Sequence, residues 1–195
     1  MIGFVEGQLV EALPTQVVVN VQGVGYEVLI PLSSFERLPA VGQPVRLLTH
    51  LVVREDAHQL YGFWTVAERA LFRLLTRAIS GVGPKIALNI LSGISVAAFH
   101  EAVSRGDVKL LSGISGVGKK TAERIVVELK DKLAATATAL PAAATVGGQT
   151  SHDAALALEA LGFKPKDAQE AVRAAVAVLG PGAAVDRVVR AALQK

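Results

Sequence analysis

The stretch ISGVGPKIALNI, residues 79–90, recurs as ISGVGKKTAERI at residues 114–125. The two copies are 35 residues apart, and eight of their twelve positions are identical. Each copy places a Gly-Val-Gly turn before a lysine and an apolar pattern of helical period, which predicts a tight turn between two helices. We therefore expect a duplicated helical unit, with helices near residues 84–91, 95–104, 107–111 and 119–133.

The chemistry of the repeated turn favours a bound phosphate. Glycine can take positive φ there and leaves no side chain to block close approach. The helix that follows starts with unpaired N–H groups at the positive end of its dipole, and lysines stand just beyond the turn. None of these groups reads a base edge, so contacts to nucleic acid would be to its backbone. The candidate residues of this helix–hairpin–helix motif are Gly81, Val82, Gly83 and Lys85 in the first copy and Gly116, Val117, Gly118, Lys119 and Lys120 in the second.

The distribution of charge supports this interpretation. The whole chain has a net charge of +3. Residues 1–64 carry 3 basic and 6 acidic side chains, whereas residues 65–134 carry 11 basic and 6 acidic ones, a net of +5. Residues 135–195 add a net of +1. A single Gly-Val-Gly turn would suit a structural hairpin equally well, but two copies with lysines in the most basic third predict a polyanion site.

Part of the second copy also matches a nucleotide-binding loop. Gly113 and Gly118 are spaced as in a P-loop and precede Lys119, but Lys120 follows where a Ser or Thr is needed to bind magnesium. The residues before Gly113 have a short helical pattern and not that of an apolar strand. These two failures disfavour an ATPase.

Residues 1–64 show the alternation of β-strands. Strands are predicted over Gln16–Ile30, on both sides of a turn at Gly23-Val24-Gly25, and over Val45–Arg54 and Gln59–Phe63. Several short strands in so few residues predict a small closed or half-closed barrel. The chain has few aromatic residues, so we expect the barrel to act through shape and assembly and not by stacking single strands.

From Thr65 onward the apolar pattern is helical, and the first helix is expected to bury Val66, Ala70, Leu71, Leu74, Leu75 and Ala78. Residues 135–150 are small and uncharged, which predicts a flexible linker. Residues 151–195 carry three helical patterns, with start signals at Ser151 and Asp153 and stop signals at Gly162 and Gly180. The predicted domains are therefore a barrel at 1–64, a tandem helix–hairpin–helix domain at 65–134, the linker at 135–150 and a three-helix domain at 151–195.

Glu55 and Asp56 stand at the predicted hairpin tip before the last strand. A metal-dependent nuclease would need more ligands, and adjacent strand residues point to opposite faces. From the residues alone, an ordinary solvated turn is the favoured interpretation. We expect neither a metal nor another cofactor, because the histidines are scattered: His50, His58, His100 and His152.

The remaining composition limits the cellular context. The chain has no cysteine, which removes disulfides and fits a reducing cytoplasm. Its first residues lack a basic leader before an apolar run, so no signal peptide is expected. No stretch approaches the roughly 20 unbroken apolar residues of a membrane span.

Several segments together resemble the RuvA family of bacterial Holliday-junction-binding proteins. They are MIGFVEG at the start, VVREDAHQLYGF at the end of the predicted barrel, GVGPK and GVGKKTAERIVVELKDKL in the repeat, and the C-terminal segment with LGF. The resemblance covers nearly the whole chain. It implies a multi-domain β-then-α fold, with an OB-type barrel, a tandem helix–hairpin–helix domain and a C-terminal three-helix bundle of the UBA-like type. It also implies a non-enzymatic, sequence-independent binder of four-way DNA junctions that needs no cofactor.

The same resemblance implies partners and residue roles. The family forms a homotetramer that holds the junction open and square-planar, with one or two tetramers on the DNA. It recruits the hexameric RuvB ATPase for branch migration in recombination and repair, and it cooperates with the RuvC resolvase. By position, Glu55 and Asp56 match the family's acidic pin, and Leu158 and Leu161 match the apolar patch that docks the motor. The duplex-binding segments match the turn residues named above together with Arg124.

Tandem helix–hairpin–helix units also occur in nucleases and glycosylases, so a general repair module is the alternative. Such enzymes need a catalytic Asp or Lys in a pocket, or a metal cluster, and the sequence indicates neither. A preference for a four-way junction over linear duplex would separate the two functions.

Overall fold

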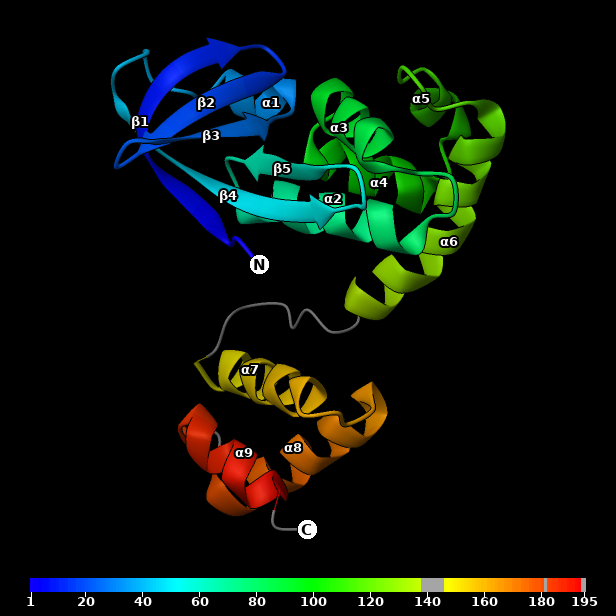
Figure 1. Ribbon diagram of the computed structural model, residues 1–195. Coiled ribbons are helices and arrows are strands. Elements are labelled where there is room, and N and C mark those ends of the chain that lie inside the picture. The colour runs from blue at the N-terminus through cyan, green and yellow to red at the C-terminus, as the bar shows by residue number, and fades with distance from the viewer. Residues whose placement is uncertain (138–145, 181, 194–195) are drawn as a thin grey trace. The chain divides into compact units, whose positions relative to one another are not determined.

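The computed structural model of the chain describes residues 1–137, 146–180 and 182–193. The chain forms two compact units, Met1–Ala135 and Thr136–Lys195. The first unit combines a β-barrel with a group of helices, and the described part of the second is helical (Figure 1). The order, β then α, is the one expected from the sequence.

Five strands close into the N-terminal barrel (Figure 1). They neighbour one another in the order β1-β2-β3-β5-β4, and β4 pairs with β1 to close the circle. All pairs are antiparallel except β3 with β5, which run parallel at Leu29 and Tyr61. The OB-type barrel is therefore confirmed. The strands are β1 (Phe4–Leu13), β2 (Gln16–Val21), β3 (Val24–Leu29), β4 (Pro44–Val53) and β5 (His58–Phe63), and a short helix, α1 (Leu32–Phe35), follows β3.

The hairpin between β2 and β3 is tighter than predicted. Strand β3 already begins at Val24, and the turn residues are Gln22 and Gly23, both with positive φ. The side-chain oxygen of Asn20 accepts a hydrogen bond of 2.8 Å from the Gly23 N–H. The predicted turn at Gly23-Val24-Gly25 is thus wrong by one residue, because a two-residue turn with positive φ matches the twist of the strands.

The helices that follow the barrel start and end close to the predicted positions. Side chains of Thr65, Ser95 and Asp107 accept hydrogen bonds from the first turns of three of them. Such N-caps explain why the chain turns helical there. The helices are α2 (Val66–Ala78), α3 (Pro84–Gly93), α4 (Val96–Arg105), α5 (Val108–Ser112) and α6 (Lys119–Ala137).

Helix α2 packs its aromatic residue on the barrel. Phe72 is fully buried, and its ring centroid lies 5.0 Å from that of Tyr61 and 4.9 Å from that of Phe63. The predicted apolar face missed Phe72 and wrongly included Val66, which is 65% exposed at the start of the helix, and Ala70, which is also exposed. The end of β5 therefore belongs to the core of the helices, whereas the interior of the barrel has a core of its own.

A buried carboxylate reinforces the same junction. Glu68 of α2 is 6% exposed and accepts hydrogen bonds from Ser33 Oγ at 2.6 Å, Ser34 Oγ at 3.4 Å and the Thr65 N–H at 2.9 Å. Its own N–H donates to Thr65 Oγ1 over 3.1 Å, which completes a capping box. One side chain thus both starts α2 and ties it to α1.

The described part of the second unit contains three helices around their own core: α7 (Val146–Ala160), α8 (Pro165–Leu179) and α9 (Val185–Leu193). Helix α7 begins before the predicted start signals at Ser151 and Asp153, so that prediction is wrong. Half of the predicted linker, residues 138–145, lies outside the described residues. The two ends of the expected 135–150 segment belong to α6 and α7.

Two further sequence expectations can be compared with the described ranges. Within the described ranges, no single helix is long and apolar enough to cross a membrane. Helices α3 and α4 reach the length and apolar composition of a membrane span only when taken together, and the chain bends by 98° between them. Both helices contribute to the core of the first unit. The same ranges hold no group of three or more His, Cys, Asp or Glu side chains that could bind a metal ion.

Candidate nucleic-acid interface

The two repeated turns have the same backbone geometry. Gly81 and Gly116 have φ values of +87° and +83°. A side chain in this region costs about 1–2 kcal/mol, which favours glycine at both positions. In each copy the N–H of the central valine donates to the carbonyl three residues earlier, over 3.2 Å from Val82 to Ile79 and 2.9 Å from Val117 to Ile114.

The valines of the turns face inward. Val82 and Val117 are each 3% exposed and belong to the core of the first unit. Their side chains anchor the turns, so these two residues can meet DNA only through their backbone groups.

The second glycine of each turn differs from the expectation of positive φ. Gly83 has φ −84° and ψ 176° and is the N-cap of α3, where no side chain caps the helix. A Cβ at Gly83 or Gly118 would meet nothing within 4 Å. These glycines therefore leave the surface open above the helix starts. Uncapped N–H groups at an open helix start can bind a phosphate oxygen.

Three lysines surround these helix starts. Lys85 is the second residue of α3, and Lys119 and Lys120 are the first two residues of α6. All three are exposed. The structure thus places positive side chains beside both candidate phosphate sites, as the sequence predicts.

Arg124 has a more structural environment than the lysines. Its Nη1 donates to the carbonyl of Ser80, in the first turn, over 2.9 Å, and its Nε lies 3.8 Å from the carboxylate of Glu128. The side chain remains 51% exposed. Arg124 therefore already links α6 to the first turn in the free protein.

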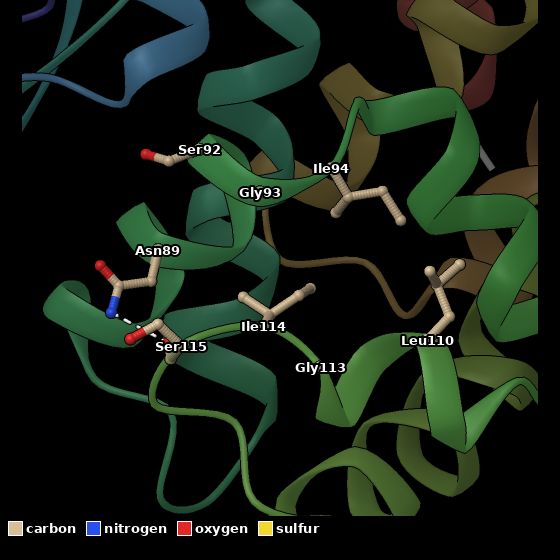
Figure 2. A pocket seen from close by; sticks show the side chains of 8 residues that line it. All are labelled: Asn89, Ser92, Gly93, Ile94, Leu110, Gly113, Ile114 and Ser115. Atoms are coloured by element: carbon tan, nitrogen blue, oxygen red, sulfur yellow. Dashed lines mark hydrogen bonds between the residues drawn. The ribbon is translucent and has the colours of Figure 1, made fainter.

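Asn89 makes the corresponding contact in the opposite direction. Its Nδ2 donates to the carbonyl of Ser115, in the second turn, over 3.0 Å (Figure 2). Asn89 was not among the residues predicted from the sequence. The repeat did hold a signal, because it aligns Asn89 with Arg124 at the eleventh of its twelve positions.

The acidic pair lies near the first turn. Glu55 and Asp56 are both exposed in the loop between β4 and β5, where the Arg54 N–H donates to the Ala57 carbonyl over 2.9 Å. Asp56 and Lys85 line the same recess, of about 550 Å³. One carboxylate of the pair, that of Asp56, therefore lines a recess together with the start of α3.

The two leucines expected to dock a motor have different environments. Leu158 is fully buried in the core of the second unit, whereas Leu161 is 61% exposed. The expectation is therefore corrected for Leu158, because a side chain inside the three-helix core cannot touch a partner while the bundle is folded. Leu161 alone of the pair is available at the surface.

Comparisons with known proteins agree with this architecture. The model of the RuvA N terminal domain matches residues 1–62, that of the SAM-like Helix-hairpin-helix tandem matches residues 72–131, and that of the RuvA C-terminal domain matches residues 149–195.

Relatives match along nearly their full length, and each of the following is named Holliday junction branch migration complex subunit RuvA. The chain is 47% identical to the protein of Opitutus terrae, over 99% of this chain and all of that protein. It is 47% identical to that of Methylococcus capsulatus, over 100% and 98% of the two chains. It is 51% identical to that of Chromobacterium violaceum, over 89% of each.

Proposed function

The chain belongs to the RuvA family, and we propose that it is the DNA-binding subunit of a Holliday junction branch migration complex. It binds four-way junctions through their arms, and the ATPase motor of the complex is the separate RuvB protein. The subunit has no catalytic step of its own in this function.

The paired turns are the observation that carries the proposal. Two copies of one backbone geometry stand in one unit, each with an open helix start and exposed lysine. A single turn of this kind would hold one phosphate, whereas two hold a duplex by both strands across a groove. The contacts are to phosphates, so they are independent of base sequence and weaken with salt.

The acidic pin, Glu55 and Asp56, has a separate role in this proposal. Exposed carboxylates near a phosphate-binding surface repel continuous duplex at short range. At an open junction centre the strands part, and the carboxylates meet fewer phosphates. The pin therefore disfavours linear DNA and helps to keep the strands apart at the crossover.

Assembly completes the proposed activity. A homotetramer would present four pairs of turns, one pair for each arm of the junction, on one or two faces of the DNA. The C-terminal three-helix unit would dock RuvB, with Leu161 in the contact, and the RuvC resolvase would act on the same open junction. The complex would work in the cytoplasm, where chromosomal junctions arise.

The direct test is an electrophoretic mobility-shift titration of the full chain on a four-way junction and on linear duplex of the same arm sequence. We expect tighter binding to the junction, with the preference unchanged when the arm sequences are replaced. Equal affinity for the two DNAs would favour a general repair module instead.

A further inference from the structure

Two side chains cross from one repeat to the other. Asn89 of α3 donates to the carbonyl of Ser115, and Arg124 of α6 donates to the carbonyl of Ser80. The two donors are 35 residues apart in the sequence, and so are the two carbonyls. The same contact is therefore made twice, once in each direction.

Both contacts reach the same point of a turn. Each accepting serine directly precedes the glycine with positive φ. A Cβ at Gly116 would lie 3.4 Å from Nδ2 of Asn89, and one at Gly81 would lie 3.9 Å from Nη1 of Arg124. Each donor thus lies against the turn of the other repeat, and glycine at that position leaves the donor its space.

We propose that Asn89 is a positioning residue that, together with Arg124, fixes the separation of the two phosphate-binding turns. The inference rests on the proposed function and concerns how the same interface is held. Asn89 is the informative member of the pair, because it is uncharged and its loss removes no positive charge from the DNA-binding surface.

The surroundings of Asn89 show why a hydrogen bond matters there. A recess of about 440 Å³ opens between α3, α5 and the second turn. Asn89 and Ser115 lie at one end of it, and Ile94 and Leu110 lie at the other (Figure 2). At the end of this recess, the bond from Asn89 to Ser115 is a direct polar link from α3 to the second turn.

A fixed separation improves binding without adding a contact. The phosphates on two strands stand at a set distance, and turns already held at that distance bind both without a further loss of freedom. Without the bond from Asn89, the second turn must be ordered when DNA binds. The net value of one hydrogen bond corresponds to a loss of affinity of about fivefold.

The test is a titration of a four-way junction with the full chain carrying Asn89→Leu, at several salt concentrations. Leucine has nearly the shape of asparagine and lacks the amide donor. Asn89→Ala is the second variant, in case the leucine disturbs the recess. We expect about fivefold weaker binding with the same dependence on salt as the wild type, at a temperature where melting curves show both proteins folded.

The matched control is Ser92→Ala, one turn further along α3. Ser92 lines the same recess as Asn89 but forms its hydrogen bonds away from both turns. Its loss removes the hydrogen bond of 3.0 Å that the Leu32 N–H of α1 donates to Ser92 Oγ, and the one of 2.8 Å that Ser92 Oγ donates to the Leu88 carbonyl within α3. This variant should bind the junction as the wild type does. Equal losses of affinity in the Ser92 and Asn89 variants would show a general effect of weakening α3 and would overturn the proposal.

A double-mutant cycle separates positioning from direct contact with DNA. If Asn89 positions the second turn, Asn89→Leu costs clearly less in a chain that already carries Lys119→Ala and Lys120→Ala, because that turn then contributes less. Fully additive losses, or binding by Asn89→Leu within twofold of the wild type, would refute the positioning role. If the wild type itself failed to prefer the junction, the proposed function would fail, while the cycle on linear duplex would still test Asn89.

Discussion

At the scale of single residues, the DNA-binding surface combines backbone geometry with a few charges. Lys119 and Lys120 stand exposed at the start of α6, directly after the second turn. Replacing both with alanine should weaken binding about equally on all sequences, because phosphates carry no base identity. The log–log dependence of affinity on salt should become shallower by up to about two units. Titrations from low to moderate salt measure this slope, and an unchanged slope would mean that neither lysine touches DNA.

His50 gives the barrel–helix junction a dependence on pH. Burial lowers the pKa of His50, and the neighbouring charge of Arg73 on α2 lowers it further, with smaller effects from Arg77 and Arg69. Its Nδ1 is buried without a hydrogen-bond partner in the described structure, and its ring lies edge-on to Phe72 at 5.6 Å.

The sign of the effect follows from this lowered pKa. The folded chain favours neutral His50, so the unfolded chain binds the proton more readily. Stability is therefore full above the unfolded-state pKa, about 6.5, and falls as the pH drops below it. Urea titrations of the wild type and of His50→Gln between neutral and mildly acidic pH should show a shallower decline in the variant. Parallel declines would contradict the assignment.

At the scale of elements, we expect that removing the Glu68 carboxylate, which links the start of α2 to α1, lowers the stability of the fold. Glu68→Ala removes the acceptor for Ser33, Ser34 and the Thr65 N–H, and leaves those donors partly buried. We expect a loss of about 2–3 kcal/mol in the free energy of unfolding. Glu101→Ala, which removes only an exposed ion pair with Arg105, is the control and should cost less than about 1 kcal/mol. If both variants lost the same free energy of unfolding, the buried hydrogen bonds of Glu68 would contribute no more than an exposed ion pair.

The elements also show what the sequence could and could not predict. The repeat predicted the starts of α3 and α6, because glycine, lysine and helical period coincide there. Strand β1 was not singled out, since Gly7 interrupts its alternation. A Cβ at Gly7 would lie 2.1 Å from the carbonyl oxygen of Asn20, so a tertiary approach explains that glycine. The role of Asn89 escaped prediction for a similar reason, as its partner belongs to the other repeat.

At the scale of the whole molecule, DNA binding and motor docking should be separable. All the turns, lysines and pin residues belong to the unit Met1–Ala135, and the three-helix unit has its own core. A chain that ends at Ala139 should keep its affinity for the four-way junction and lose the stimulation of RuvB. Mobility shifts and the ATPase rate of added RuvB measure the two activities. Loss of junction binding by the truncated chain would contradict this division of labour.

In the proposed function, the acidic pin makes the barrel part of the choice of DNA, which is a property of the whole molecule. Asp56 lines the same recess as Lys85, the side chain that we propose attracts phosphate at the first turn. A carboxylate at this place lowers affinity for any DNA that passes close to it. It is useful only if it penalises the wrong substrate more than the right one. In the proposed function, continuous duplex must run past the pin, whereas the strands of a four-way junction diverge around it.

We therefore expect that Glu55→Gln with Asp56→Asn strengthens binding to linear duplex more than to the junction and narrows the ratio between them. Folding should be nearly unchanged, since both side chains are exposed. Paired titrations at one fixed salt concentration give the ratio, and Glu101→Gln on α4, also exposed, controls for the loss of negative charge elsewhere. If both affinities rise by the same factor, the pin is a general repulsion and not a junction filter. If neither changes, Glu55 and Asp56 form only a solvated turn, and discrimination must come from the arrangement of the paired turns in the assembly.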